Sequence, residues 1–577
     1  MKVQISVSLL SVVALLVVSG TVRSDLRGAA SGPAPRLTAT TQITHDGYRK
    51  ANLLSDESRL FVTELPASSR VIAELMLPSA DRSVLISPFS SLQALDVCPD
   101  HSKLLVSSTS KGSGESELWT LPLPNGDPVR LAGLSARDAS WSTDGKQLVF
   151  AKDSDLFVAN GDGSGPHKIH TAAGSVFAAR FSPNGQRIRF SVSDTEQNTT
   201  TLWEISKDGT KPYMLLADWP YKTTACCGNW TADGRYYVFQ ASQTVANTTL
   251  VVTSLWVLPD TNAETAVPPA QITNGPMSFG NPSPARDDKN IWAIGVQPTV
   301  EVVKYEAKKK QFVPLISGLS ATDVEFSNNG KWIAYVAIPE GTLWRARADG
   351  SERMQLTTDA ERAALPHWSP NDKQIAYASS MPGGSWKLSI VGADGSNAHK
   401  MLSENGSQID ANWSPDGERL MFGEFNRDQN GLKIRIIDFK TGQITTIPGS
   451  DGLFSPRWSP NGRYIAALSP NGTDLMLFDF KTGKWTTWLK EPAGSVSYPV
   501  WSADSQSLYF DDFVTGSEAI RRVRVGQSEP ELVFELGTVE RYPGALGPWT
   551  SRAADGSFMF VRDRSTQEVY QLTLELP

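Results

Sequence analysis

Apolar residues in this chain recur two positions apart, in short runs that each follow a polar turn. Leu148 and Phe150 show this spacing clearly. The same spacing recurs at Ile188 and Phe190, Ile333 and Tyr335, Ile375 and Tyr377, and Leu420 and Phe422. A period of two places alternate side chains on one face of a β-strand, so that face is expected to be buried. The pattern predicts a chain of short strands.

The turns between these runs carry a repeated motif, which is an aromatic residue, Ser, Pro or a polar residue, Asp or Asn, and Gly. The clearest copies occupy residues 413–417 and 458–462. Related copies begin at Trp141, Phe181, Trp230, Phe326, Trp368 and Trp501. Pro presets φ, Asp or Asn bonds locally, and Gly accepts a positive φ. Each motif therefore predicts a strand, a tight turn and a second strand.

The motif recurs twelve times when four weaker copies near residues 57, 101, 288 and 556 are included, at steps of 40 to 54 residues. A second hairpin follows each motif, and a short fourth strand closes the unit. Four antiparallel strands in about 45 residues are typical of one propeller blade. A linear solenoid is the alternative. The first strand, at residues 42–44, has no blade before it, and the last unit ends after its third strand, at residues 568–573. These complementary ends favour closed rings.

Twelve blades exceed the usual range of one ring, so we expect an all-β chain with tandem β-propellers, most simply two six-bladed rings. The expected domains are residues 41–309 and 310–577, with residues 312–316 as the outer strand that completes the second ring. A seven-plus-five division remains open. A strand exchange in which the chain end closes the first ring also remains open.

The N-terminus has the pattern of an export signal. Lys2 precedes an apolar stretch from Val3 to Val22, and Arg23 follows. Residues 1–24 are expected to be a cleaved signal peptide or a retained membrane anchor, and residues 25–40 a flexible linker. Both alternatives place the propellers outside the cytoplasm, either in the periplasm or tethered to the outer face of the inner membrane.

Charge and cysteine content narrow the functional classes. The formal net charge of −7 and the lack of a helix-turn-helix pattern argue against direct nucleic-acid binding. The chain has three cysteines. Cys226 and Cys227 are adjacent, and we expect two small buried residues in preference to a vicinal disulfide or a metal-binding pair. Cys98 is expected in the core.

No sequence motif identifies a catalytic residue, a metal ligand or a cofactor site. The chain lacks a Gly-x-Ser-x-Gly nucleophile motif, and its six histidines lack metal-ligand spacing. The residue before the motif aromatic is mostly polar and falls on the strand expected to lie innermost. These channel-rim candidates are Arg180, Asn229, Glu325, His367, Asn412 and Arg457. They either line a binding channel or are solvated strand ends.

The Trp-Ser-Pro-Asp-Gly turn, together with the Leu-Trp…Asp-Gly hairpin seen at residues 343–350, resembles the repeats of TolB-like, WD-like bacterial β-propellers. The resemblance covers nearly all of residues 41–577. More narrowly, segments such as residues 226–231 and 452–458 are similar to the extracytoplasmic region of CadC-type membrane regulators, without the winged-helix domain of those proteins. This resemblance implies a sensor or scaffold part and carries over no catalytic residue, because the repeat motif is structural.

The leading hypothesis is a non-catalytic propeller that binds an envelope protein, a peptide or a small ligand as a scaffold or sensor module, without a cofactor. The alternative is a hydrolase or lyase with its site at a channel mouth, where Glu325 and His367 are the first suspects. A third possibility is the sensor of a split signalling system, which a retained Val3–Val22 helix favours. The sequence predicts neither the ligand nor the oligomeric state.

Overall fold

The computed structural model describes residues 34–577 apart from residues 57, 67–68, 90, 110–115, 195–198, 245–250, 261–266, 382–383, 404–405, 427–430, 491–495, 514–517, 538, 543 and 545. The expected signal or anchor, residues 1–24, lies outside the described residues, as do residues 25–33 of the expected linker. Within the described ranges, no helix combines the length and apolar character that crossing a membrane requires.

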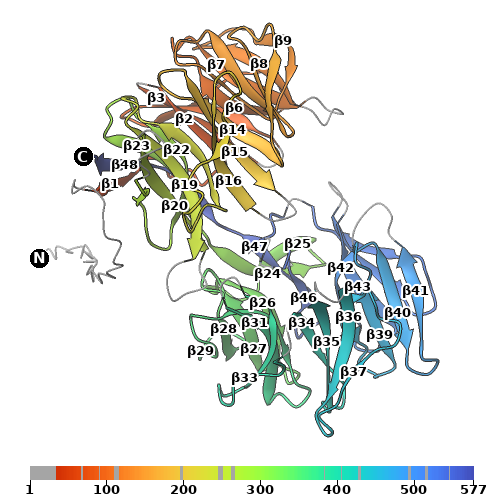
Figure 1. The fold of residues 1–577 in the computed structure, drawn as a ribbon. Coiled ribbons are helices and arrows are strands. Elements are labelled where there is room, and N and C mark those ends of the chain that lie inside the picture. The colour runs from red at the N-terminus through yellow and green to blue at the C-terminus, as the bar shows by residue number, and fades with distance from the viewer. Residues whose placement is uncertain are drawn as a thin grey trace, which may run out of the picture.

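The regular elements of the described chain are all β-strands, arranged as twelve four-stranded sheets. Figure 1 shows these sheets gathered into two groups, one from red to green and the other from green to blue. The predicted all-β class and tandem-propeller architecture are confirmed. In each sheet the strands follow one another outward from the ring centre, and chain order changes only in the two sheets that close the rings.

The first ring comprises six sheets. From the innermost strand outward they are β2 (Lys50–Ser55), β3 (Arg59–Glu64), β4 (Val71–Met76), β5 (Asp81–Val84); β6 (Leu92–Val97), β7 (Lys103–Thr109), β8 (Ser116–Pro122), β9 (Val129–Ser135); β10 (Asp138–Trp141), β11 (Gln147–Lys152), β12 (Asp155–Asn160), β13 (His167–Thr171); β14 (Ser175–Phe181), β15 (Arg187–Asp194), β16 (Thr199–Ser206), β17 (Tyr213–Met214); β18 (Ala225–Trp230), β19 (Tyr236–Thr244), β20 (Val251–Pro259), β21 (Ala270–Gln271); and β22 (Ser278–Pro284), β23 (Asn290–Gln297), β48 (Thr566–Glu575), β1 (Arg36–Gln42).

The second ring comprises the other six sheets. In the same order they are β26 (Ala321–Phe326), β27 (Trp332–Ala337), β28 (Leu343–Arg347), β29 (Met354–Gln355); β30 (Arg362–Trp368), β31 (Gln374–Ser380), β32 (Lys387–Gly392), β33 (His399–Lys400); β34 (Ser407–Trp413), β35 (Arg419–Asn426), β36 (Gly431–Asp438), β37 (Ile444–Thr446); β38 (Phe454–Trp458), β39 (Tyr464–Leu468), β40 (Asp474–Asp479), β41 (Lys484–Lys490); β42 (Val496–Trp501), β43 (Ser507–Asp512), β44 (Ala519–Arg524), β45 (Glu531–Glu535); and β46 (Thr550–Arg552), β47 (Phe558–Asp563), β24 (Val300–Glu306), β25 (Gln311–Pro314).

Contacts between neighbouring sheets close each ring. In the first ring the innermost strands meet in the order β2, β6, β10, β14, β18, β22 and back to β2. In the second ring the order is β26, β30, β34, β38, β42, β46 and back to β26. The apolar pairs that the sequence places two apart are buried between these sheets, as predicted. Burial of apolar faces between stacked sheets is what holds a propeller together.

The repeated motif forms the turn between the first two strands of a sheet. In the copy that begins at Trp141, the Ser142 hydroxyl donates to Asp144 Oδ1 at 2.7 Å and accepts the Gln147 N–H at 3.0 Å. Gly145 completes the turn with a φ of 69°. The short polar side chains therefore satisfy backbone groups that the tight turn leaves without a ladder partner.

The motif tryptophan often joins one sheet to the sheet before it. Trp368 Nε1 donates to the carbonyl of Glu325 at 3.1 Å, and Trp413 Nε1 donates to the carbonyl of His367 at 3.0 Å. Trp501 does the same to Arg457 at 3.0 Å. The aromatic residue thus has a structural role at the boundary between neighbouring sheets.

The strand pairing departs from the boundary expected at residues 309 and 310. β24 lies in the second ring, where it pairs with β47, although it precedes that boundary. β48, at the end of the chain, lies in the first ring between β1 and β23. Figure 1 shows the dark blue β48 beside the red β1. This arrangement is the strand exchange that the sequence left open. The reason is that the second ring is one continuous segment, β24 to β47, whereas the first ring takes the third strand of its closing sheet, β48, from the distant C-terminal part of the chain.

The chain consequently crosses between the rings twice, at residues 298–299 and 564–565. The register runs from Gln297 opposite Thr566 to Val300 opposite Asp563, so the two crossings lie side by side and antiparallel. The Arg564 N–H donates to the carbonyl of Thr299 at 2.8 Å. The rings are therefore joined by a continuous two-stranded ribbon.

Candidate functional site

The innermost strands carry a recurring β-bulge. The ladder register shifts in the innermost strand of eight consecutive sheets, β14 through β42, just before the residue that precedes the motif aromatic. One residue of each bulge has a positive φ, between 44° and 59°. These residues are Ala178, Cys227, Asn281, Asp323, Leu365, Asp410, Ser455 and Tyr498. A bulge inserts an extra residue and redirects side chains. Each bulged strand can therefore direct more side chains toward the ring centre than a regular strand, in which only every second side chain faces that way.

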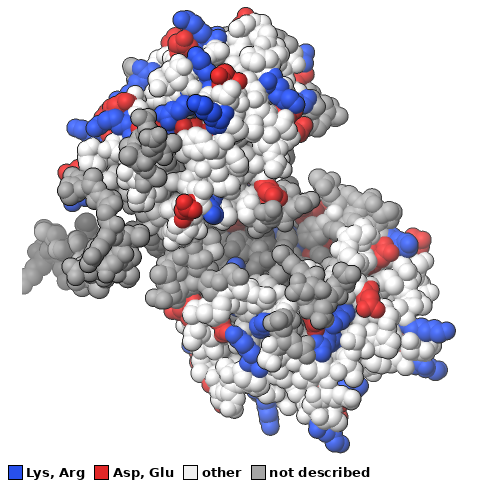
Figure 2. All heavy atoms as spheres, viewed as in Figure 1, with Lys and Arg blue, Asp and Glu red and all other residues white. Residues whose placement is uncertain are grey.

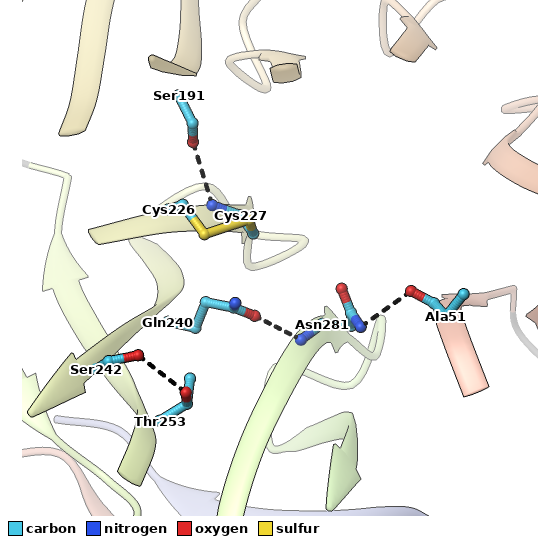
Figure 3. The surroundings of a disulfide bond; sticks show 8 residues. All are labelled: Ala51, Ser191, Cys226, Cys227, Gln240, Ser242, Thr253 and Asn281. Carbon is cyan, nitrogen blue, oxygen red and sulfur yellow. Dashed lines mark hydrogen bonds between the residues drawn. A yellow bond between two sulfur atoms is a disulfide. The ribbon is translucent and has the colours of Figure 1, made fainter. Parts of the chain in front are cut away.

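The neighbouring sheet holds several of these bulges in place. The Cys227 N–H donates to Ser191 Oγ at 3.3 Å, and the Asn281 N–H donates to Gln240 Oε1 at 2.8 Å. Both acceptors lie on the second strand of the preceding sheet, in β15 and β19. Figure 3 shows these contacts around the fifth and sixth sheets. The central side chains are thus positioned by contacts between sheets.

A cavity of about 580 Å³ lies at the centre of the first ring. All six innermost strands contribute to its wall, which includes Asn52, Gln93, Asp138, Arg180, Asn229 and Asn281. Residues of the β3–β4 and β11–β12 turns also line it. β3, β11 and β23 are each the second strand of their sheet, counted from the ring centre. The two turns follow the C-terminal ends of β3 and β11, and the chain crosses to the second ring from the C-terminal end of β23. The cavity therefore lies toward the side of the first ring that is joined to the second ring.

Two of the channel-rim candidates, Arg180 and Asn229, come together in this cavity. Arg180 Nε donates to Asn229 Oδ1 at 3.2 Å, and Asn229 Nδ2 donates to the carbonyl of Pro282 at 2.9 Å. Arg180 Nη1 lies 3.4 Å from Asp138 Oδ2, with 17% and 14% of the two side chains exposed. Both candidates are thus part of a partly buried polar network and are not solvated strand ends.

The cavity wall contains a disulfide that the sequence analysis did not favour. Cys226 and Cys227 are bonded to each other, so the expectation of two small unlinked residues is wrong. Adjacent side chains in a regular strand point to opposite faces, but the positive φ of 59° at Cys227 breaks this alternation. Cys226 is buried, whereas Cys227 lines the cavity. Cys98 is a buried free thiol, as expected.

Glu325, His367 and Arg457 form a charged cluster near the centre of the second ring. His367 Nδ1 lies 3.1 Å from Glu325 Oε1, and its Nε2 lies 3.9 Å from Asp410 Oδ1. Arg457 Nη1 donates to Asp410 Oδ1 at 2.7 Å. Burial lowers the pKa of His367, but the Glu325 carboxylate outweighs that effect and the pKa is raised. Asp410, at a bulge, therefore joins two of the candidates and was missed by the sequence analysis.

The remaining candidate, Asn412, joins two neighbouring sheets through a hydrogen bond. Its Oδ1 accepts the backbone N–H of Trp458, in the next sheet, at 2.7 Å. Glu325 Oε2 and Asp96 Oδ2 accept the Trp368 and Trp141 N–H groups in the same way, each at 2.8 Å. This position in the repeat therefore joins sheets, and only some of its side chains also reach a ring centre.

Described side chains from several sheets of the second ring meet near its centre. Tyr498, from the fifth sheet of that ring, and Leu365, from the second, pack in one cluster with Leu546. The Tyr498 hydroxyl donates to the carbonyl of Leu546 at 3.0 Å. Leu546 belongs to the segment between β45 and β46, and Glu540 of the same segment lies 3.6 Å from Arg49 of the first ring. The first ring thus has a polar cavity at its centre, and near the centre of the second ring the described side chains of Tyr498, Leu365 and Leu546 pack together.

Asp96 lies on an innermost strand of the first ring and Asp323 on one of the second ring, and the pKa of each carboxyl is raised. Burial raises the pKa of each carboxyl to about 6, although backbone N–H groups of Trp141 and Leu365 stabilise the charged forms. Among the described residues, no group of three or more His, Cys, Asp or Glu side chains is arranged to hold a metal ion.

Comparison with known proteins gives one family match. Residues 373–569 match the model of the TolB beta propeller domain. The uncharacterized protein Atu1656 of Agrobacterium fabrum is 25% identical over 183 residues, which are 29% of this chain and 61% of that protein. The uncharacterized peptidase YuxL of Bacillus subtilis is 29% identical over 110 residues, which are 18% of this chain and 17% of that protein. The chain thus spans less than two thirds of both relatives.

A solved structure assigned as TolB from Agrobacterium tumefaciens aligns with 46% of this chain and 99% of its own, at 17% identity and a TM-score of 0.38. The family match covers β31 through β47 and reaches into β48. The family match agrees with the resemblance of the sequence repeats to TolB-like propellers. The chain therefore contains a TolB-like β-propeller.

Proposed function

We propose that this chain is a non-catalytic binding module that receives a peptide or a small ligand in the central cavity of its first ring. The observation that carries the proposal is the cavity of about 580 Å³ at the centre of the first ring, to which all six innermost strands contribute polar side chains. A cavity of this size matches the range of ligand sites in proteins. Sheets that close into a ring hold such a site rigid and lower the cost of binding.

We further propose that the module works outside the cytoplasm with an envelope protein or peptide as its partner. The apolar stretch Val3–Val22 and the TolB-like match support this placement. A retained Val3–Val22 helix makes the chain a tethered sensor or scaffold, as in the CadC-type regulators it resembles, and a cleaved one makes it periplasmic. N-terminal sequencing of the mature chain tests this: a start near Asp25 means cleavage, and a start at Met1 means a tether.

The binding proposal is tested by photo-crosslinking in intact cells that produce the chain. A benzophenone amino acid replaces Gln93, in the cavity wall, and in a control it replaces Val129, which is 58% exposed on the outer strand β9. The proposal predicts a discrete adduct from position 93 and none from position 129. A second variant, Asn281→Trp, fills the cavity and is expected to abolish the adduct. Equal labelling from both positions, or no adduct from position 93, contradicts the proposal.

The alternative is a hydrolase or lyase at the second ring, and the hydrogen bond between Glu325 and His367 is the observation that favours it. The stretch that this chain shares with the peptidase YuxL supports testing peptides first. A carboxylate that raises the pKa of a histidine is an arrangement used in general acid–base catalysis. Turnover that the purified chain shows and His367→Ala loses, with an unchanged melting temperature, supports this alternative. Turnover that survives the substitution argues against it.

A further inference from the structure

The charges that line the cavity of the first ring have the opposite sign to the charge of the whole chain. Four cationic side chains, Arg70, Arg137, Lys152 and Arg180, line it together with two carboxylates, Asp138 and Asp153. The whole chain carries a formal charge of −7. On the face in Figure 2, blue and red side chains are interspersed over both lobes. The positive excess is thus a local property of the cavity.

The cations occupy one side of the cavity. Arg70 lies between β3 and β4, Arg137 between β9 and β10, Lys152 at the end of β11, and Arg180 in β14. These elements belong to the first four sheets of the ring. The fifth and sixth sheets supply only uncharged groups to the wall, namely Cys227 of the disulfide, Gly228, Asn229, Asn281 and Pro282. The cavity therefore has a cationic side and a neutral side.

Two of the arginines are left without a carboxylate. Arg70 Nη1 donates to the neutral amide of Gln93 at 2.8 Å. The guanidinium of Arg137 lies over the ring of Phe177, 5.5 Å from its centre. Among the described residues, neither Arg70 nor Arg137 forms an ion pair, whereas Arg180 faces Asp138. Both side chains are exposed at the cavity wall, so their remaining N–H donors can reach a ligand.

A planar guanidinium pairs well with a carboxylate, because its parallel N–H groups match the two oxygens. The cation–π contact with Phe177 restrains the Arg137 side chain, which lowers the entropy lost on binding. A cleft whose wall carries an excess of one sign of charge also attracts ligands of the opposite sign. The neutral side offers an amide oxygen, a proline ring and a disulfide, which suit the uncharged body of an organic molecule.

We propose that the cavity of the first ring binds an organic carboxylate, with the acid group at Arg70 and Arg137 and the neutral body against Cys227 and Pro282. This inference rests on the proposed function, because it names the ligand class of the same site. The carboxylate comes either from the C-terminus of a peptide or from a small organic acid. Inorganic phosphate shares the negative charge but lacks the neutral body, so it is expected to bind more weakly.

The test is isothermal titration of the full mature chain with four probes: N-acetyl-dialanine, its C-terminal amide, succinate and inorganic phosphate. The proposal predicts that at least one of the two carboxylates binds at least tenfold more tightly than the neutral amide and the phosphate. N-acetyl-dialanine as the tighter acid identifies a peptide C-terminus, and succinate identifies a small acid. Equal affinity for the acid and its amide, or tighter binding of phosphate, overturns the proposal.

Matched variants locate the site. Arg70→Gln and Arg137→Gln are each expected to weaken carboxylate binding at least tenfold with an unchanged melting temperature, since both side chains are exposed. Arg130→Gln removes the same charge from the outer strand β9 and is expected to leave affinity unchanged. Loss in all three variants, or in none, overturns the proposal. If the amide binds as well as the acid and Asn281→Trp abolishes both, the carboxylate inference falls while the binding module stands.

Discussion

The backbone N–H of Arg564 donates to the carbonyl of Thr299 at 2.8 Å, in the short ribbon where both crossings leave one ring for the other. These residues are far apart in the sequence. Their contact follows from the exchange of strands, since β23 continues into β24 while β47 continues into β48. The rings are therefore not two independent segments joined by a linker.

Deleting residues 566–577 is expected to destabilise the first ring, although the deletion lies at the opposite end of the chain. It removes β48, together with Leu572 and Leu574, which are 0% and 4% exposed in the core shared with β23. Loss of two buried leucines alone costs about 4–10 kcal/mol. Limited proteolysis is expected to cut first within residues 36–297. Deleting only Leu576 and Pro577 is the control, and equal proteolysis of the two shortened chains contradicts the exchanged pairing.

Replacing Gly228 with Ala is expected to destabilise the chain by about 1–3 kcal/mol, the usual effect of overpacking. A Cβ at this position lies 2.5 Å from Tyr237 Cε1 and 2.5 Å from the Val238 carbonyl oxygen, and the backbone of β19 cannot move away easily. Gly423→Ala is the matched control, because its Cβ meets nothing closer than 3.6 Å. Thermal or urea unfolding measures both. A Gly228 variant as stable as the Gly423 variant means that the close approach is absent.

Replacing Asp96 with Asn is expected to change how stability depends on pH. Burial raises the pKa of Asp96 to about 6 in the folded chain, whereas an unfolded aspartate loses its proton near pH 4. The folded state thus binds more protons between these values. The stability that this group contributes is complete below about pH 4 and is lost as the pH rises through about 6. Melting temperatures of the variant should fall less steeply than wild type from pH 4 to pH 6.5.

Asp162→Asn is the control for that measurement. A hydrogen bond from Ser164 lowers the pKa of this exposed carboxyl, so its contribution has the opposite sign and is lost as the pH falls. The Asp162 variant should therefore keep the wild-type decline between pH 4 and pH 6.5. An Asp96 variant that also keeps the full decline contradicts the raised pKa.

Thiol labelling is expected to separate the three cysteines. Without a reductant, iodoacetamide should modify none of them in the folded chain, because Cys226 and Cys227 are bonded and Cys98 is buried. After treatment with a dithiol, each reductant molecule becomes a disulfide as the Cys226–Cys227 bond takes up two electrons and two protons. Cys227 should then be labelled before Cys98, since it lines the cavity. Peptide mass spectrometry reads the order, and labelling of Cys227 without reductant means that the bond is absent.

The local architecture could be predicted from the sequence because its signals are local. The spacing of Leu148 and Phe150 gives the strand, and the residues from Ser142 to Gly145 give the turn. The exchange of β24 and β48 left no such signal. A third strand of a blade has the same alternation whichever ring it joins, and its partner is chosen by contacts hundreds of residues away. The chain ends indicated that rings close but did not show which end closes which ring.

Local motifs also account for the part of the candidate site that could be predicted. Of the candidates at the position before the motif aromatic, Arg180 and Asn229 line the cavity of the first ring. The bulge residue two positions earlier was missed, because its identity varies from copy to copy and no motif marks it. Asp410 and Cys227 are such residues, and the positive φ at each is what brings their side chains into the clusters. An Asp or Asn at this position is a usable signal, since these residues tolerate the left-handed region.

The pairing of the last strands also determines when each ring can close during synthesis. β46 and β47, which close the second ring, and β48, which closes the first, are the last three of the described strands to leave the ribosome. Neither ring can close before these strands are made, so both closing sheets stay incomplete until they emerge. The two rings are therefore completed one directly after the other, however early their other strands emerge.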